Sequence, residues 1–512
     1  MTSVGPDPPV PNGAGGRIDP SSDSSTASRS SAERRRQFSP FVNYGVQRGI
    51  VETLLGLRGI ALAAILGAEW FGAWSLARIG HRYAGLGDLG LIRGLEVEAS
   101  ARGTSTERKA ADFARATLAW FMAVFGTMSA CAAVAAWLVP DDRASAVLGG
   151  LALGVLIERV WLYATSFMRA RGLLSHLGWC ELVNASLHLV LTTGLAFIYG
   201  IWGAFIGFLV AHLIGLSRTS AYVPLRPHWS PPRVAKLARI GFPITVSQFL
   251  YTLMTSVDRL VVGIFLGIEV LGYYAFAVAV SSFGAVIGFV FRTVLFPGVF
   301  RMARRVGPEA SIDYLDLALF PFAWLFAPLL GLAALAIAPA VELWLPEYAE
   351  AVPAARIFMF IGIVQGLNMV VQLGVVAHDR QHRLPLITGG AVMANLVLAL
   401  GCVTLGLGLE VLATAALVTR LAHVMIQMLL VGYAAAWRDR LRVAARILTP
   451  ILVCGGLVFG LSRIFDTTSA SGFGLAVAAY VAGLAVLVPG IIAGVRAAST
   501  MDSAAAIPRP PD

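Results

Sequence analysis

The sequence predicts an all-α integral membrane protein with about fourteen transmembrane helices. Three observations lead to this fold class. The chain is 57% hydrophobic and has a mean hydropathy of +0.75. Only 13% of its residues are charged, about half the fraction in an ordinary soluble domain. Long apolar runs follow one another along nearly the whole chain, and Lys and Arg gather in alternate connections between them.

Each apolar run is long enough to cross a hydrocarbon core about 30 Å thick. Because backbone polar groups must be paired within lipid, and because the runs are longer than barrel strands, each is expected to be an α-helix. The predicted spans are 49–67, 71–92, 112–138, 144–168, 177–197, 200–217, 240–266, 270–297, 314–339, 352–376, 384–404, 409–434, 443–462 and 472–494.

The orientation follows from the distribution of positive charge, since Lys and Arg are retained on the cytoplasmic side. The connections after even-numbered spans carry clusters such as those in 93–109 and 218–239, whereas the opposite connections contain only Arg143, Arg356 and Arg463. This alternation predicts that both termini are cytoplasmic. The net charge of +10 therefore reflects topology and attraction to membrane lipid, and no nucleic-acid partner is expected.

The spans group into two halves. A Gly-, Pro- and Ser-rich segment, 1–45, is expected to be a disordered cytoplasmic tail, and 218–239 a basic cytoplasmic linker. Six-helix bundles are predicted at 46–217 and 240–436, two extra transmembrane helices at 437–495, and a cytoplasmic tail at 496–512.

A short repeat supports this division. LGAEWFG at 66–72 recurs as LGIEVLG at 266–272, in each case between the first two spans of a half and on the outer side. The halves are therefore interpreted as parallel repeats related by an axis along the membrane normal. The alternative is that any tight helical hairpin needs two glycines and an interfacial aromatic residue.

Neither metal nor cofactor is predicted. Cys131, Cys180, Cys402 and Cys454 each lie alone in an apolar segment, without metal-type spacing. The chain also lacks the GxxxxGK[ST] motif of an ATP-binding loop.

Charged residues inside the spans are the first candidates for function, because each costs about 2.5–3.5 kcal/mol at mid-helix. The deepest arginines are Arg58, Arg159, Arg259 and Arg420. They are expected to face an interior cavity as substrate-binding cations. Arg78, His81 and Arg82 share one side of the second span. They either line the wall of the cavity that the first half provides, opposite Arg58, or extend to the membrane–water interface.

Polar side chains recur at helical spacing on three spans, which predicts cavity-lining faces. The residues are Gln248, Tyr251, Thr252 and Thr255 before Arg259; Gln365, Asn368 and Gln372; and His423 and Gln427 after Arg420. Three acids, Asp88, Glu158 and Asp258, are either coupling residues or packing partners of buried cations. For Asp88, in the sequence DLG, packing and turn formation are favoured.

Three further stretches resemble a known family: YAGLGDLGL at 83–91, GFPITVSQFLYTLMTSVDRLVVGIFLG at 241–267, and ELWLPEYAEAVPAARIF at 342–358. They are similar to the polysaccharide (O-antigen, Wzx-like) flippases of the multidrug/oligosaccharidyl-lipid/polysaccharide exporter superfamily. The resemblance implies two six-helix bundles around a central cavity, two extra C-terminal helices and no enzymatic step. It also implies alternating access that moves an undecaprenyl pyrophosphate-linked oligosaccharide, or a similar polyprenyl-linked glycan, to the outer leaflet of the bacterial cytoplasmic membrane. Membrane lipid and the polysaccharide polymerase or ligase machinery are the implied partners.

Three alternatives stay open from the sequence. A cation-coupled multidrug exporter of the same superfamily would favour buried acids, but deep arginines outnumber them here. A membrane glycan polymerase or ligase could use Glu69 as its acid, although Glu69 is duplicated at Glu269 and the outer connections are short. A purely structural or partner-binding protein would leave the duplicated halves and polar faces unexplained.

Overall fold

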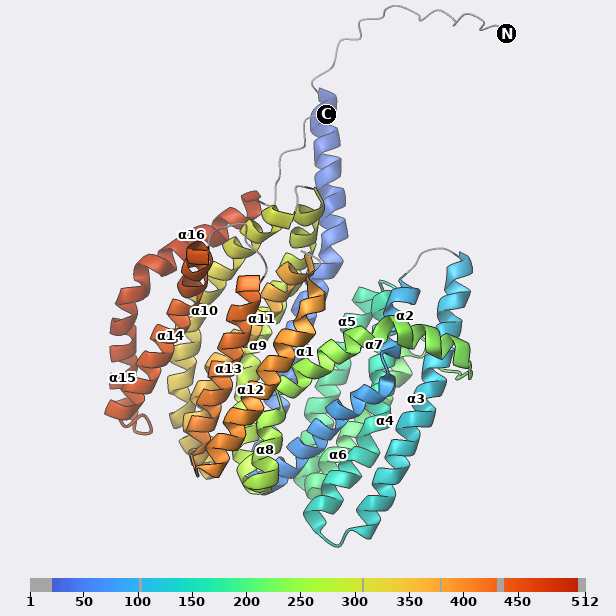
Figure 1. The fold of residues 1–512 in the computed structure, drawn as a ribbon, viewed down its shortest axis with the longest axis horizontal. Coiled ribbons are helices and arrows are strands. Elements are labelled where there is room, and N and C mark those ends of the chain that lie inside the picture. Colours follow the sequence, from blue (N-terminus) through green and yellow to red (C-terminus); the bar gives the residue numbers. More distant parts are fainter. Residues whose placement is uncertain (1–20, 101–103, 306–307, 378–379, 431–436, 505–512) are drawn as a thin grey trace, which may run out of the picture.

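All regular elements among the described residues of the computed structural model are helices (Figure 1). The structure describes residues 21–100, 104–305, 308–377, 380–430 and 437–504. The first half contains α1 (Ser21–Ala84), η1 (Gly85–Asp88), α2 (Leu91–Ala99), α3 (Thr104–Leu138), α4 (Asp142–Ala170), α5 (Leu174–Leu187), η2 (His188–Thr192) and α6 (Thr193–Thr219). The second half contains α7 (Pro231–Met254), α8 (Val257–Phe265), α9 (Ile268–Arg305), α10 (Pro308–Trp344), η3 (Pro346–Ala351), α11 (Val352–Ala377), η4 (Gln381–Arg383), α12 (Leu384–Thr404), α13 (Leu409–Leu430), α14 (Trp437–Ile464), α15 (Ala470–Gly483), η5 (Leu484–Leu487) and α16 (Val488–Ala504).

Eleven helices in the described part of the chain are long and apolar enough to cross a membrane, or up to twelve if α7 and α8 form one bent span. Two of the eleven, Asn43–Asp88 and Leu174–Thr219, are 46 residues long, which corresponds to roughly 69 Å of helix and more than twice the hydrocarbon thickness. Both contain non-helical backbone, at Gly67 and at Gly200, where the sequence predicts a connection between two spans. The count of fourteen stays a prediction that depends on reversal of the chain at these breaks.

The repeated hairpins pack against each other on the side away from the N-terminus. Gly67 and Gly267 have φ angles of 72° and 99°, a region open to glycine at little cost, and they start the two turns. A Cβ on Gly72 would overlap the carbonyl of Ile268, and a Cβ on Gly272 would overlap the carbonyl of Ala68. The two contacts are equivalent, since Gly72 corresponds to Gly272 and Ala68 to Ile268 after a shift of 200 residues. Two parallel repeats related by an axis produce such a pair of contacts.

A second pair of contacts deeper in the bundle has the same symmetry. A Cβ on Gly56 would meet the ring of Phe283 at 3.5 Å, and at the equivalent place the hydroxyl groups of Ser256 and Tyr83 are 3.0 Å apart. The repeat in the sequence therefore corresponds to a repeated packing of α1 against α9 and of α1 against the α7–α8 junction.

Two apolar cores hold the bundle together. The larger joins the first hairpin of α1 to α9, α10, α11, α13 and α14, and the second lies among α2, α3, α4 and α5. Helix α7 crosses between the halves (Figure 1), in contact with α2 and α3 on one side and with α12 on the other.

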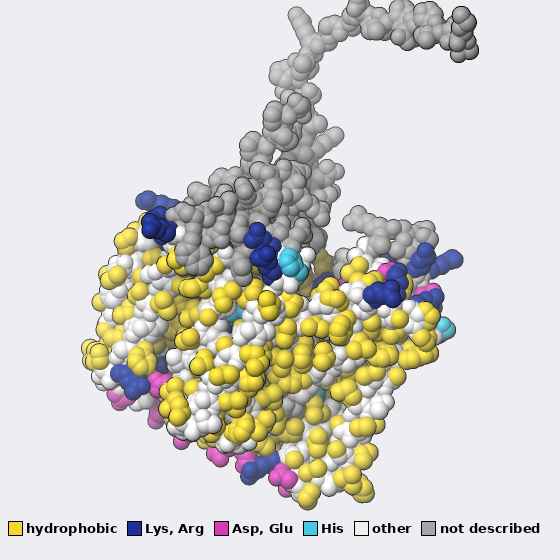
Figure 2. Space-filling model, in the orientation of Figure 1, with side chains coloured by type: hydrophobic (Ala, Val, Ile, Leu, Met, Phe, Trp, Pro, Cys, Tyr) yellow, Lys and Arg dark blue, Asp and Glu magenta, His cyan; other side chains and the backbone are white. Residues whose placement is uncertain are grey.

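The surface agrees with a multi-pass membrane protein. Figure 2 shows hydrophobic side chains over the middle of the visible face, and charged side chains at its upper and lower edges. Lys and Arg predominate at the upper edge, on the side of the N-terminus, while Asp and Glu lie mainly at the lower edge.

The ends of the chain differ in part from the expectation. Helix α1 begins at Ser21, so residues 21–45 of the expected disordered tail are helical, whereas 1–20 lie outside the described residues. The segment after the second span contains a short helix, α2, whose packing on α7 was not predicted. Residues 505–512 of the C-terminal tail also lie outside the described part.

Replacement of Gly272 by Ala should destabilise the protein, because the added Cβ overlaps the Ala68 carbonyl and the two hairpins must separate. We expect a loss of about 1–3 kcal/mol in the free energy of unfolding, typical of overpacking. The matched control is Gly389→Ala in α12, where an added Cβ meets nothing within 4 Å, and which should raise stability by about 0.5–1 kcal/mol. Unfolding in detergent measures both; similar effects of the two substitutions would contradict the hairpin contact.

Candidate functional site

A cavity of about 450 Å³ lies between α1, the α7–α8 junction, α9, α11 and α13. Its wall contains five arginines: Arg58, Arg78, Arg82, Arg259 and Arg420. Glu52 is the one acidic residue among the described residues of the wall, and it pairs with Arg48 at 2.5 Å. The cavity is therefore strongly positive.

The first wall of the cavity comes from the two arms of α1. The guanidinium of Arg58 lies 5.8 Å from the ring centre of Trp74, and its Nε is buried without a hydrogen-bond partner in the described part of the chain. Arg78 donates two hydrogen bonds to Glu158, of 2.6 and 3.0 Å, and lies 4.5 Å from the ring centre of Phe208. Glu158 thus compensates Arg78, whereas no ion pair in the described residues involves Arg58.

The opposite wall is built around a break between α7 and α8, which are inclined by 49°. The hydroxyl of Thr255 donates to the Tyr251 carbonyl at 3.1 Å, and that of Ser256 to the Thr252 carbonyl at 2.5 Å. Hydroxyl groups that bond locally to the backbone bend helices. The sequence prediction of one unbroken helix over 240–266 therefore needs correction at Thr255 and Ser256.

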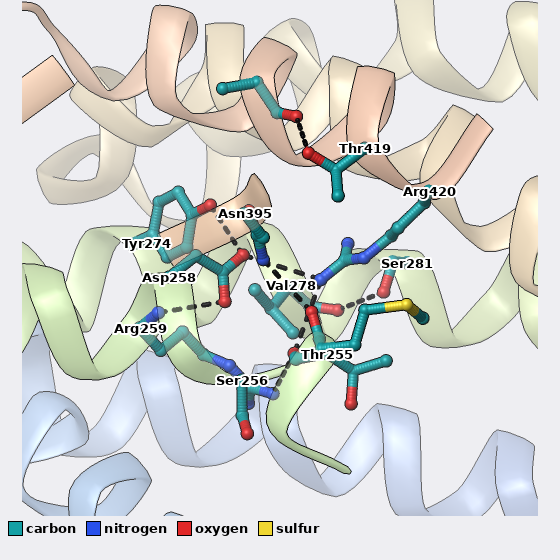
Figure 3. Close-up of polar contacts among 12 residues, drawn as sticks. Thr255, Ser256, Asp258, Arg259, Tyr274, Val278, Ser281, Asn395, Thr419 and Arg420 are labelled. Carbon is teal, nitrogen blue, oxygen red and sulfur yellow. Dashed lines mark hydrogen bonds and ion pairs between the residues drawn. The ribbon is translucent and has the colours of Figure 1, made fainter. Parts of the chain in front are cut away.

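The break leaves the carbonyl of Thr255 available to cations. It accepts hydrogen bonds from Arg259 at 2.8 Å and from Arg420 at 3.4 Å, as Figure 3 shows. Both guanidinium groups are thereby drawn to one point between α8 and α13. The Nε atoms of both arginines are buried and, among the described residues, have no hydrogen-bond partner.

Asp258 is fully buried beside this junction and is held by three groups. It accepts the backbone N–H of Arg259 at 2.9 Å and the hydroxyl of Tyr274 at 3.0 Å, and it pairs with Arg420 at 3.5 Å (Figure 3). The guanidinium of Arg259 forms no ion pair with a carboxylate in the described part of the chain. Asp258 therefore compensates Arg420 more closely than Arg259.

Arg159 lies apart from the main cavity. It lines a second cavity of about 250 Å³ within the first half, together with Arg58, Arg78 and Glu158. Its guanidinium donates to the carbonyl of His81, in the last turn of α1, where carbonyl groups lack helical partners. The structure thus brings together three of the four predicted cations, and Arg159 supports the end of α1.

The predicted polar residues divide in the same way. Tyr251, Thr255 and Gln365 line the main cavity. Gln248 is exposed and accepts a hydrogen bond from Arg93 of α2 at 3.0 Å, one turn before Tyr251 on α7 and outside the cavity lining. Asn368 is buried and Gln372 half-buried, both outside this lining.

His423 and Asp88 also have local partners. His423 is buried between α12 and α13, 3.2 Å from the Thr388 hydroxyl and 2.9 Å from the Gln427 amide. Asp88 accepts the N–H of Gly90 at 2.5 Å, as a turn-forming side chain does. The proposed functional roles of all these residues stay predictions.

Several cavity residues were missed at the sequence level, namely Glu52, Trp74, Ser75, Ser281 and Ser282. The repeat offers a signal for two of them: His81 and Arg82 lie in the first repeat where Ser281 and Ser282 lie in the second. Arg48 and Glu52, four residues apart on one helix, also have the spacing of an ion pair.

Comparisons with known proteins agree with the resemblance drawn from the sequence. A family described as polysaccharide biosynthesis protein matches residues 103–306, while no curated protein sequence matches the chain. The fold is similar to that of the lipid II flippase MurJ in an inward closed conformation, with a TM-score of 0.63 at 14% identity over 87% of this chain and 98% of that chain.

Two further solved structures share the fold. They are inward-facing and outward-facing conformations of a multidrug resistance MATE family transporter of the MOP superfamily. The inward-facing structure has a TM-score of 0.60 at 15% identity over 77% of this chain and 95% of that chain. The outward-facing one has a TM-score of 0.55 at 16% identity over 80% and 96%. The family match over 103–306 agrees with a part in polysaccharide biosynthesis, and the solved structures show that the chain shares the fold of these transporters.

The pairing of Arg78 with Glu158 can be tested by a double-mutant cycle. Arg78→Ala leaves the Glu158 carboxylate without its main partner. We expect a loss of about 2–4 kcal/mol in unfolding free energy, less than for a fully buried pair because the two side chains are 19% and 20% exposed. Arg78→Ala combined with Glu158→Gln should cost less than the sum of the two single substitutions. The control is Arg143→Ala, which removes an exposed pair with Glu69 and should cost less than about 1 kcal/mol. Additive effects of the Arg78 and Glu158 substitutions would contradict the pairing.

Proposed function

We propose that this protein, which has the fold of MOP-superfamily transporters, is a flippase for a lipid-linked oligosaccharide. Its substrate is an undecaprenyl pyrophosphate-linked oligosaccharide or a similar polyprenyl-linked glycan. It moves this substrate from the cytoplasmic to the outer leaflet of the bacterial cytoplasmic membrane, for assembly of cell-surface polysaccharide. The observation that carries the proposal is the cavity with five arginines and one already paired acid.

The charge of the cavity suits the part of the substrate that is hardest to move. The prenyl tail is stable in lipid, but a pyrophosphate cannot cross the hydrocarbon core without compensating cations. A guanidinium group keeps its charge and binds phosphate oxygens through two parallel hydrogen bonds. Arg58 and Arg259 are the leading ligands, because neither forms an ion pair among the described residues and each has a buried Nε without a hydrogen-bond partner there.

The remaining wall suits the sugars. Ser75, Tyr251, Thr255, Ser281 and Gln365 line the same cavity and supply hydroxyl and amide groups able to bond to sugar hydroxyls. No bond is broken in this reaction, since the protein only has to replace water around charged and polar groups.

Alternating access would separate the repeated halves on one side of the membrane and then on the other. The reciprocal contacts of Gly72 and Gly272 close the side predicted to face outward. Substrate exit would require these contacts to open. The break at Thr255 and Ser256 lies where α7 and α8 connect the two halves.

A multidrug exporter is the second candidate, since the structural neighbours include multidrug resistance transporters. A cationic drug would be repelled by the arginines of this cavity, so the observed charge favours the glycolipid. For a polymerase or ligase, the candidate acid Glu69 pairs with Arg143 and does not line the cavity.

Arg259 provides the sharpest test, because its removal leaves no carboxylate stranded. Arg259→Ala should reduce the rate of flipping about ten- to hundredfold, because a hydrogen bond to a charged group contributes about 1.5–3 kcal/mol. The midpoint of thermal unfolding should change little. Arg259→Lys should recover flipping only in part, because Lys keeps the charge but lacks the planar fork. Appearance of the lipid-linked glycan at the outer face and thermal unfolding in detergent are the two measurements.

Two matched variants make the result interpretable. Arg420→Ala should lower both flipping and stability, because it removes the cation that pairs with buried Asp258. Arg143→Ala, which changes an exposed arginine outside the cavity, should leave flipping unchanged. Normal flipping by a stable Arg259→Ala protein would rule out the proposed role of the cavity cation.

A further inference from the structure

A separate cavity of about 580 Å³ lies between α11, α13 and α14. Its wall is largely apolar and includes Ile357, Phe360, Leu417, Leu421 and Leu452. None of the cavity arginines described above lines it. Cavities of this size with an apolar wall and a few polar groups at one end are typical of ligand sites.

The length of this cavity matches one leaflet of a membrane. Along α14 its lining extends from Ile451 to Arg463, a rise of about 18 Å at 1.5 Å per residue. Half of a hydrocarbon core is about 15 Å thick. The apolar part, from Ile451 to Phe459, rises about 12 Å, which accommodates most of an acyl chain within one leaflet. The charged end lies where the sequence predicts the outer interface.

Three charged residues, Arg356, Glu410 and Arg463, surround that end. Arg463 and Glu410 compensate each other at 2.9 Å. Arg356 donates to the Thr467 hydroxyl at 2.5 Å, while its Nε is buried and lacks a hydrogen-bond partner among the described residues. The uncompensated cation at the mouth is thus Arg356.

An adjoining cavity of about 260 Å³ continues outward from this point. It shares Pro353, Arg356 and Ser462 with the apolar cavity and adds two acids, Glu342 and Asp466. The order from the membrane centre outward is therefore apolar wall, cation, then anions.

We propose that these two cavities bind one aminophospholipid of the outer leaflet, with an ethanolamine head group. One acyl chain fills the apolar cavity, the phosphate binds Arg356, and the ammonium group lies against Glu342 and Asp466. This sequence of charges complements a zwitterionic head group, because its phosphate precedes its ammonium on the way out of the membrane. A primary ammonium, unlike the quaternary group of choline, can also donate hydrogen bonds to the two carboxylates. The proposal does not depend on the identity of the transported substrate.

Occupation of the site would tie helix α14 to α11 and α13. Gly455 and Gly456 of α14 line the apolar cavity, and a Cβ added to either meets nothing within 4 Å. The space beside these glycines is filled by the chain of the lipid in the proposed complex.

Native mass spectrometry of the purified full chain tests the proposal. The protein in detergent is mixed with equal amounts of phosphatidylethanolamine, phosphatidylglycerol and phosphatidylcholine that have identical acyl chains. We expect phosphatidylethanolamine to be retained at least fivefold over the other two lipids. Gly455→Leu should reduce its retention to that of phosphatidylcholine, because the new side chain occupies the apolar cavity.

The matched control is Gly460→Leu on the same helix. It also adds a side chain where a Cβ meets nothing within 4 Å, but outside the cavity lining, and should leave retention unchanged. Arg356→Gln should weaken retention of all three lipids, and Glu342→Gln with Asp466→Asn should remove the preference for phosphatidylethanolamine over phosphatidylglycerol. Thermal unfolding verifies that each variant is folded.

Three results would overturn the proposal. The first is equal retention of phosphatidylethanolamine by the wild-type and Gly455→Leu proteins. The second is a preference of the wild-type protein for phosphatidylglycerol. The third is displacement of bound phosphatidylethanolamine by an equal amount of a polyprenyl phosphate, which would assign the cavity to the tail of a polyprenyl lipid.

Discussion

The cost of placing guanidinium groups at membrane depth shapes the whole interior of this protein. Each such charge is expensive in lipid, and the structure turns the arginines inward and offers each a different form of compensation. Arg78 pairs with the carboxylate of Glu158, and Arg58 lies over the ring of Trp74. Arg259 donates to the Thr255 carbonyl at the helix break, which it shares with Arg420. Helix breaks and aromatic rings are thus as important to the site as acids.

The incomplete nature of this compensation is what makes the cavity suitable for an anion. Carbonyl groups and ring faces stabilise a cation without neutralising it, so the cavity retains positive charge. In the proposed mechanism, a phosphate that enters replaces weak partners by strong ones, while Asp258 and Glu158 keep Arg420 and Arg78 in place. Binding can then occur without collapse of the surrounding packing.

The duplicated halves share a scaffold but differ in charge. Reciprocal contacts at Gly72 and Gly272 preserve the axis between the repeats. At equivalent positions, however, Arg58 corresponds to Asp258, and Arg82 corresponds to Ser282. In the proposed flippase the symmetric framework would let the two halves move about a common axis, while the asymmetric charges define one polar site within it.

Much of this arrangement could be predicted from the sequence. Hydropathy locates the helices, the repeat predicts parallel halves, and the cost of buried charge predicts that Arg58, Arg259 and Arg420 face inward. The bend at Thr255 and Ser256 could not be predicted in this way, because it depends on which backbone carbonyls the hydroxyl groups bind. The contact of Gln248 with Arg93 depends on how α2 packs on α7, which helical spacing does not reveal. The position of Arg159 depends on the end of α1, which only tertiary packing determines.

An experimental structure of the full protein with bound undecaprenyl pyrophosphate would test the role of the cavity most directly. We expect the phosphate oxygens to lie at charged hydrogen-bond distance, about 2.7–2.9 Å, from the guanidinium groups of Arg58 and Arg259. Binding of the pyrophosphate elsewhere, with both arginines in their present contacts, would contradict the central claim that these cations compensate the substrate during transport.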